Sequence, residues 1–204
     1  MSLESSKTLS GVGAILIAVG SFTSLSGFMG ILSLIGIILV LIGMKGLADF
    51  YGEKGIFDNA LYGFIFGIIG VVVAIALFVT ALLSGMGWSM GMMSEMGKIP
   101  LATIGGLLLG WITFVVFVIV EAIFYRKAFS LLSEKSGEKM FDTAGLILLI
   151  GAVLTIILIG AILTLIAWIL AAVAFFSIKP PPTTEQPKHL YHSLLKFLKR
   201  PYFR

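Results

Sequence analysis

Long apolar segments alternate with short polar ones along the chain. The longest apolar segment, residues 143–178, contains no Asp, Glu, Lys, Arg or His. Residues 142–178 would form a single helix about 55 Å long, whereas the hydrocarbon core of a bilayer is about 30 Å thick. We therefore expect this segment to fold as two short spans that turn near Gly160 and Ala161. The N-terminal apolar segments have the same form, with a turn at Ser26 and Gly27.

The pattern predicts an all-α fold, a polytopic transmembrane bundle of six spans in helical hairpins. The predicted spans cover residues 9–25, 28–47, 58–83, 101–129, 142–158 and 161–178. Four spans with two re-entrant hairpins are an alternative that leaves the sidedness unchanged. This transmembrane domain would occupy residues 1–179, followed by a proline-rich linker at 180–187 and a basic amphipathic tail at 188–204.

Composition agrees with a membrane location. The chain is 59 % hydrophobic and 12 % charged, whereas soluble domains carry about 25 % charged residues. The chain has no cysteine, which excludes disulfides and thiolate metal sites.

The basic residues fall on one side of the six-span topology. Of the 14 Lys and Arg residues, only Lys98 lies on the opposite side. Lys and Arg are enriched in cytoplasmic loops, so we expect a cell-membrane protein with both termini in the cytoplasm. A cleaved signal peptide over the first span is an alternative. It is disfavoured because Glu4 accompanies Lys7 and no small-x-small cleavage site follows Leu25.

A short pattern occurs twice on the predicted cytoplasmic side. Residues 52–58 read G-E-K-G-I-F-D and residues 137–142 read G-E-K-M-F-D, with one gap at Gly55. Both copies enter the membrane from the same side, which indicates a parallel duplication, with chance similarity as the alternative. The motif residues are Glu53, Phe57, Asp58, Glu138, Phe141 and Asp142.

Two interpretations of this repeated motif are open. In the first, each Asp accepts hydrogen bonds from first-turn amides of the following span and each Phe lies at the headgroup level. In the second, the four carboxylates Glu53, Asp58, Glu138 and Asp142 form a polar site for a cation or a partner.

Glu121 lies within the predicted span 101–129, where ionisable groups are costly and often functional. It is about one and a half helical turns from Arg126. The carboxyl could therefore reach interfacial water, bond Tyr125, or pair with Lys45 of a neighbouring span. Glu121 and Lys45 form the candidate intramembrane polar site, with a proton or cation relay as the more specific hypothesis.

Small residues predict where helices approach closely. Gly63 and Gly67, like Gly106 and Gly110, are four residues apart and so share one helix face. Such pairs let transmembrane helices pack at short distance. Substrate passage along these faces is the alternative interpretation.

The segment 84–99 contains five methionines around Trp88. Thioethers bind Cu(I), but the segment has no His or Cys that would raise the affinity. We expect an interfacial segment that meets lipid or a partner, and leave copper binding as an alternative.

The C-terminal tail predicts a basic amphipathic helix after a proline-rich break. Such a helix lies on an anionic leaflet or docks on a partner protein. Nucleic acid is not expected for so short a patch. Its two histidines, His189 and His192, are too few for a metal site. The residues expected to make the contact are Lys188, Leu190, Leu194, Lys196, Leu198, Lys199 and Arg200.

Several segments resemble an archaeal family of small polytopic membrane proteins of unknown function. They are residues 42–54 (IGMKGLADFYGEK), 56–63 (IFDNALYG), 125–132 (YRKAFSLL) and 141–145 (FDTAG). The resemblance covers about residues 5–179 and implies an archaeal cell membrane. It implies no activity, cofactor or site residue.

No nucleophile–base pair or metal-ligand set stands out in the sequence. We therefore expect a non-enzyme without cofactor or metal, an accessory or structural subunit of a larger membrane assembly. Its partners would be the lipid bilayer and either other membrane chains or further copies of itself. The alternative is a transporter or channel for a small solute or ion, and a lipid-acting enzyme ranks last.

Overall fold

The structure is a computed structural model that describes residues 2–23, 30–91, 101–157 and 159–180, without the side chains of 22, 23, 30 and 85–91. All its regular elements in these ranges are helical, as predicted. In chain order they are α1 (Leu3–Thr23), α2 (Gly30–Tyr51), α3 (Lys54–Gly91), α4 (Leu101–Ser136), α5 (Met140–Leu154), a 3-10 turn η2 (Thr155–Ile157) and α6 (Gly160–Ser177).

Five of these helices are long and apolar enough to cross a membrane: α2, α3, α4, α5 continued by η2, and α6. The protein is therefore a helical membrane protein with several apolar helices. The helices continue past the predicted spans, because a span ends where the hydrocarbon ends, whereas a helix ends only at a local stop signal. α3, for example, runs to Gly91 rather than 83, since no proline or charge interrupts residues 84–91.

Glycine and proline mark the helix ends. α2 and α4 are each followed by a glycine with positive φ, Gly52 at 66° and Gly137 at 75°, a conformation that side-chain-bearing residues rarely adopt. α4 begins directly after Pro100, and α6 ends three residues before Pro180. A proline also disfavours helical backbone at the residue before it.

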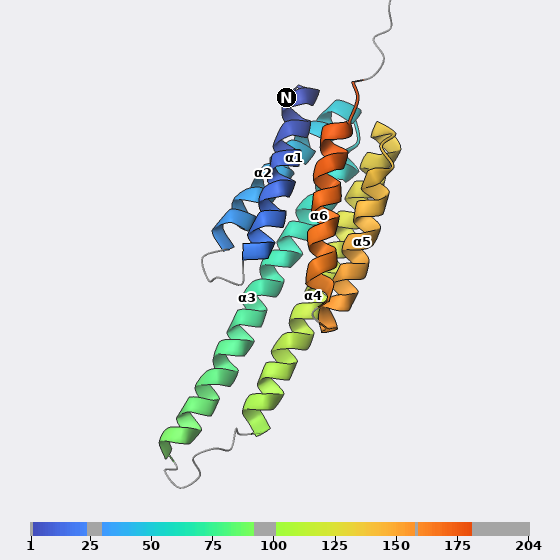
Figure 1. Ribbon diagram of the computed structural model, residues 1–204. Helices are drawn as coiled ribbons and strands as arrows, with labels where there is room; N and C mark the ends of the chain where they lie inside the picture. Colours follow the sequence, from blue (N-terminus) through green and yellow to red (C-terminus); the bar gives the residue numbers. More distant parts are fainter. Residues whose placement is uncertain (1, 24–29, 92–100, 158, 181–204) are drawn as a thin grey trace, which may run out of the picture.

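The helices form three hairpins of unequal length, α1–α2, α3–α4 and α5–α6 (Figure 1). α3 has 38 residues and α4 has 36, which correspond to about 57 and 54 Å. The other two hairpins flank only one half of this long pair. The remainder of α3 and α4 continues with no other described helix beside it. We call this remainder, residues 75–91 and 101–112, the extended part of the α3–α4 hairpin (Figure 1).

The end of the molecule with all six helices carries the start of α1, the end of α6 and the two turns at Gly52 and Gly137 (Figure 1). The two described chain ends meet there, since Lys7 Nζ donates a hydrogen bond to the Ile178 carbonyl at 3.3 Å. The basic turn segments thus lie at one end of the molecule, as the sidedness argument requires.

α1 and α2 pack backbone against backbone. A Cβ on Gly13 would lie 2.6 Å from the Gly36 carbonyl oxygen, and a Cβ on Gly36 would lie 2.7 Å from the Gly13 carbonyl oxygen. Gly43 faces Ser10 in the same way. Only residues without a Cβ permit this approach. Gly36 and Gly43 of α2 are seven rather than four residues apart, so the contact did not follow from the four-residue spacing of small residues.

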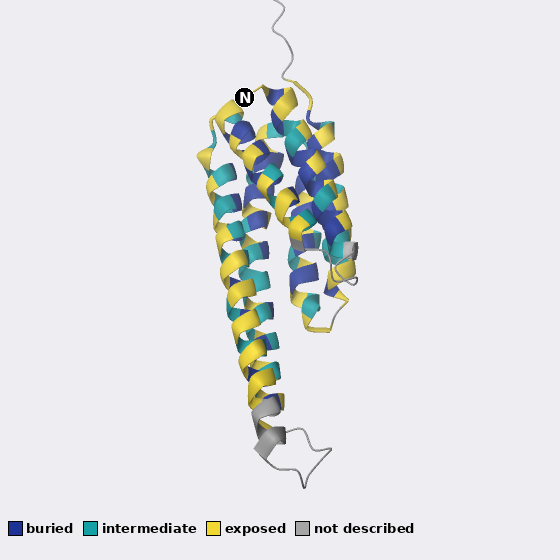
Figure 2. Cartoon of the chain, turned by 90° about the vertical axis from the view of Figure 1, so that its left-hand side faces the viewer, coloured by how far each residue is buried: buried dark blue, intermediate teal, exposed yellow. Residues whose placement is uncertain are grey.

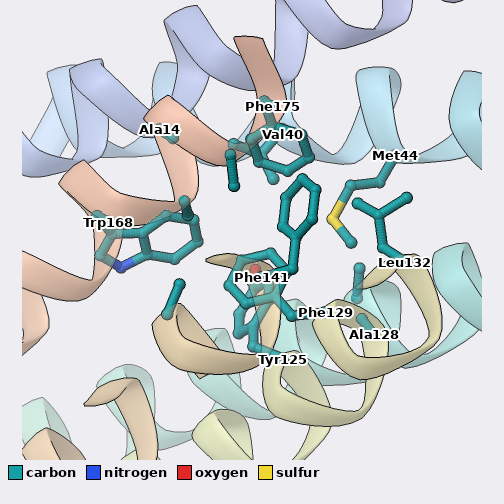
Figure 3. Close-up of a cluster of buried hydrophobic side chains, with 14 of the residues drawn as sticks. Ala14, Val40, Met44, Tyr125, Ala128, Phe129, Leu132, Phe141, Trp168 and Phe175 are labelled. Atoms are coloured by element: carbon teal, nitrogen blue, oxygen red, sulfur yellow. The ribbon is translucent and has the colours of Figure 1, made fainter. Parts of the chain in front are cut away.

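A cluster of aromatic side chains joins α4, α5 and α6 (Figure 3). Phe129 is its centre and contacts Tyr125, Phe141, Trp168 and Phe175, with ring centroids 5.9 to 6.3 Å apart. These rings are buried. The cluster fixes the part of α4 that bears Glu121, one turn before Tyr125.

Burial is uneven along the molecule (Figure 2). Within the 18-residue apolar window of each helix, 44 % of the residues are buried in α2 and 39 % in α6. The corresponding share is 17 % in α3 and 17 % in α4. The extended part exposes large apolar side chains, for example Leu83, Leu108 and Ile112.

Candidate functional site

Glu121 lies on α4 and turns its carboxyl group towards α3. A Cβ on Gly67 would lie 2.9 Å from Cδ and Oε2 of Glu121, so the carboxyl occupies space that any larger residue would fill. The side chain is half-buried. The predicted glycine face at Gly63 and Gly67 is therefore a contact surface, since a Cβ on Gly63 would lie 3.1 Å from the Tyr125 ring.

The structure does not bring Lys45 and Glu121 into an ion pair. Instead, Lys45 Nζ lies 5.9 Å from the ring centroid of Phe57, in a cation–π arrangement. The Tyr125 hydroxyl is buried and has no hydrogen-bond partner among the described residues, so the predicted bond to Glu121 is not formed either. The carboxyl of Glu121 has no ion-pair partner within the ranges that the structure covers.

A cavity of about 620 Å³ opens beside Glu121, between the beginning of α2 and the middle of α3 and α4. Gly67 and Gly70 lie in its wall, where their missing side chains allow the Glu121 carboxyl and the Phe117 ring to pack against α3. Of the described residues that line it, only Glu121 is charged, and its hydroxyl-bearing neighbour is Ser33. The aromatic part of the wall is formed by Phe64, Phe114 and Phe117.

The lining offers one acidic group within an otherwise apolar wall. One carboxyl can attract a cation or accept hydrogen bonds, and it is surrounded by apolar walls that exclude competing water. Within the described residues, no group of three or more His, Cys, Asp or Glu side chains is placed to hold a metal ion. The candidate intramembrane site is therefore this cavity with Glu121, rather than a Glu121–Lys45 pair.

The repeated motif forms two equivalent turns, α2 to α3 and α4 to α5. After each positive-φ glycine, the glutamate side chain accepts a hydrogen bond from the amide two residues on. Glu53 Oε1 accepts from Gly55 N at 3.4 Å, and Glu138 Oε1 accepts from Met140 N at 3.3 Å. The glutamates thus have the capping role that we assigned to the aspartates, because α3 and α5 begin earlier than the predicted spans.

The two turns superimpose in sequence without a gap, although the sequence pattern required one at Gly55. Counted from the glutamates, Ile56 corresponds to Phe141, and both side chains are fully buried. Both amides also bond the glutamate carbonyl three residues before, at 3.2 and 3.4 Å. Phe57 and Phe141, paired by the sequence pattern, therefore differ: Phe57 is half-buried under Lys45 and Phe141 lies in the aromatic cluster.

The motif carboxylates bind separate partners. Glu53 Oε2 pairs with Lys135 Nζ of α4 at 3.2 Å. Asp142 Oδ2 accepts a hydrogen bond from Ser133 Oγ at 2.8 Å, while Asp58 is exposed. Both contacts connect a turn to the end of α4, which supports the structural interpretation of the motif.

Two predicted sites lie outside the described residues. Most of the methionine-rich segment 84–99 falls there or has no described side chains, as do the linker from 181 and the whole tail 188–204. Copper binding and the membrane or partner contacts of Lys188 to Arg200 stay predictions.

Comparisons with known proteins identify the kind of protein without assigning an activity. The sequence profile of a family described as "Protein of unknown function (DUF996)" matches residues 32–169. An uncharacterized protein of the archaeon Methanocaldococcus jannaschii, MJ1644, is 28 % identical over 186 residues, covering 87 % of this chain and 94 % of the relative. No solved structure matches. The resemblance to an archaeal family of unknown function is confirmed.

Proposed function

The chain belongs to the DUF996 family of proteins of unknown function, and from its own residues we propose a role for it. We propose that it is a non-catalytic component of a larger membrane assembly. The extended part of the α3–α4 hairpin would carry the contacts to the other chains. The observation behind this proposal is that this part exposes large apolar side chains and has none of the other described helices beside it (Figures 1 and 2).

Gly105 makes this proposal specific. A Cβ at Gly105 would have no atom within 4 Å, whereas a Cβ at the adjacent Gly106 would lie 2.8 Å from Cβ of Ala81 in α3. Gly106 therefore serves the packing of the hairpin itself, and Gly105 offers a smooth, outward-facing strip of backbone. Small residues in such positions let a second transmembrane helix approach closely.

The test is co-purification with Gly105→Leu as the decisive variant. The tagged protein is extracted into lipid nanodiscs and its companions are identified by native mass spectrometry. We expect a stoichiometric companion chain with the wild-type protein and its loss with Gly105→Leu. Ala161→Leu, which places the same leucine side chain at an exposed position of α6, serves as the control and should retain it. A wild-type protein that leaves the membrane as a single chain would overturn the proposal.

For the orientation, we propose that the six-helix end faces the cytoplasm and that all six helices cross the membrane. The gathering of basic residues at that end supports the first point. Because the chain has no cysteine, single cysteines can be labelled without background. Lys139→Cys should react only after the membrane is permeabilised. Ile162→Cys, close to the α5–α6 turn, should react from outside if that hairpin crosses completely and should not react if it is re-entrant.

A second candidate function is the movement of a small solute or ion, which the cavity beside Glu121 favours. A purified protein without companion chains that conducts ions in liposomes, with conduction lost in Glu121→Gln, would favour this function over the assembly role.

A further inference from the structure

We propose that the cavity between α2, α3 and α4 binds a lipophilic organic cation, with its apolar groups against the cavity walls and its positive charge beside Glu121. This inference goes beyond the assembly role and depends neither on a partner chain nor on transport. Four features of the site lead to it: its charge, its aromatic wall, its size and its access.

The first feature is the charge of the site. The carboxyl of Glu121 lies against the backbone of Gly67, and the basic residues Lys45 and Lys127 interact with aromatic rings instead. Lys45 lies over Phe57, and Lys127 Nζ lies 5.7 Å from the ring centroid of Phe124. A carboxylate within a membrane is costly without a cationic partner. The ligand would supply the positive charge that the described residues do not.

The second feature is the aromatic wall. Phe64, Phe114 and Phe117 line the same cavity as Glu121. The face of an aromatic ring attracts a cation, most strongly where water is excluded, and aromatic walls are the usual means of binding quaternary ammonium groups. Rings and carboxylate together favour a cation over a neutral or anionic molecule.

The third feature is size. A volume of about 620 Å³ lies in the range of small-molecule sites, which is about 300 to 1,000 Å³. A bare metal ion would leave most of this space empty, and Mg²⁺ or Ca²⁺ requires about six or more oxygen ligands, whereas the described lining provides one carboxyl and one hydroxyl. An organic ion with several apolar groups fits both the volume and the donor set.

The fourth feature is access. The cavity is lined in part by residues whose side chains are exposed on the apolar surface, Leu34 at 47 %, Ile68 at 43 % and Val72 at 60 %. In a membrane this surface meets lipid. A ligand would therefore enter from the bilayer, so it has to be soluble in the hydrocarbon region. This condition selects a lipophilic cation rather than a small hydrophilic amine.

Binding of radiolabelled tetraphenylphosphonium to the full chain in nanodiscs of digalactosyldiacylglycerol, an uncharged lipid without an ammonium group, tests the inference. We expect saturable binding that weakens on the order of tenfold or more in Glu121→Gln, because the charge is lost while the shape is kept. Glu134→Gln, an exposed carboxylate on the same helix, is the control and should bind as wild type does. Triphenylphosphine oxide, a neutral aryl probe, should not distinguish Glu121→Gln from the wild-type protein.

A second variant keeps the test valid if Glu121→Gln folds poorly. Val71→Trp fills the cavity from an exposed position and leaves Glu121 in place, and it should abolish binding. Nanodiscs that contain phosphatidylethanolamine separate two sources of the cation: competition identifies a lipid amine as the occupant, and its absence identifies a free organic cation. Absence of saturable binding, or equal binding by wild type, Glu121→Gln and Val71→Trp, would overturn the proposal. Gly105→Leu should retain binding, so failure of the assembly role is observed separately.

Discussion

The two halves of the α3–α4 hairpin are both rich in apolar residues, but their surroundings differ. In the six-helix end, α4 packs on α5 and α6 through the rings around Phe129, and α3 packs on α4 through Gly63 and Gly67. In the extended part, the same two helices contact each other and expose apolar side chains such as Leu108 outwards. Hydrophobicity therefore does not distinguish a core position from a lipid-facing or partner-facing one. Neighbouring helices do.

The six-helix end itself is held together in two ways. On the side of α4, α5 and α6, large rings interlock (Figure 3). On the side of α1 and α2, the absence of side chains at Gly13 and Gly36 brings two backbones together. In lipid, which is as apolar as the side chains, close packing of this kind drives helix association, because the hydrophobic effect between helices is absent. Substitutions in the two halves of the hairpin should consequently differ in effect.

The largest difference is expected between Phe129→Ala and Leu108→Ala. Removing the central ring leaves a cavity among four other aromatic side chains and should lower the free energy of unfolding by about 3 kcal/mol. Leu108 is 58 % exposed, and its truncation should change this free energy by less than about 0.5 kcal/mol. Unfolding in graded detergent mixtures, followed by tryptophan fluorescence, measures both. Equal effects would mean that the two halves are packed alike.

An intermediate effect is expected for the two turns. A Cβ at Gly52 or Gly137 would meet no atom within 4 Å, so Gly52→Ala and Gly137→Ala test backbone conformation alone. Each should destabilise the protein by about 1 kcal/mol, because alanine disfavours positive φ. Gly105→Ala, also without neighbours but in a helix, is the control and should be neutral or slightly stabilising. Unequal losses at the two turns, in the same unfolding measurement, would contradict their equivalence.

The smallest difference should separate the two motif aspartates. Asp142→Ala removes the acceptor of the buried Ser133 hydroxyl and should lower the unfolding free energy by about 1 kcal/mol. Asp58→Ala removes an exposed carboxylate and should have almost no effect. If both variants instead keep full stability and lose the companion chain or the bound cation, the motif is a polar site and our structural interpretation is wrong.

The fold could be predicted from the sequence where local signals determine it. Charge-free segments predicted the hairpins, and Gly52, Gly137, Pro100 and Pro180 mark helix ends by backbone preference. The lateral arrangement could not be predicted, because in a membrane both core-facing and lipid-facing positions are apolar and periodicity carries little information. The length of α3 and α4 was underestimated. Polar residues end a predicted membrane span, but they do not end the helix that contains it.

The candidate site could be predicted only in part. Glu121 was found because a charge inside an apolar span is visible in one sequence. The residue that its carboxyl contacts was not predicted, because that residue is Gly67, which contributes only backbone. The expected partner, Lys45, lies over Phe57 instead. The cavity depends on α2, α3 and α4 coming together. Such a site is a property of packing rather than of spacing.

The central claim, that the extended part of the α3–α4 hairpin meets another chain, is tested most directly by photo-crosslinking in native membranes. A photoreactive p-benzoylphenylalanine replaces Leu108 in one variant and Ile150, an exposed residue of α5, in another. We predict that the probe at position 108 crosslinks to a defined polypeptide and that the probe at position 150 crosslinks to lipid. If both positions crosslink to lipid alone, the extended part is a lipid-facing surface and the claim is wrong.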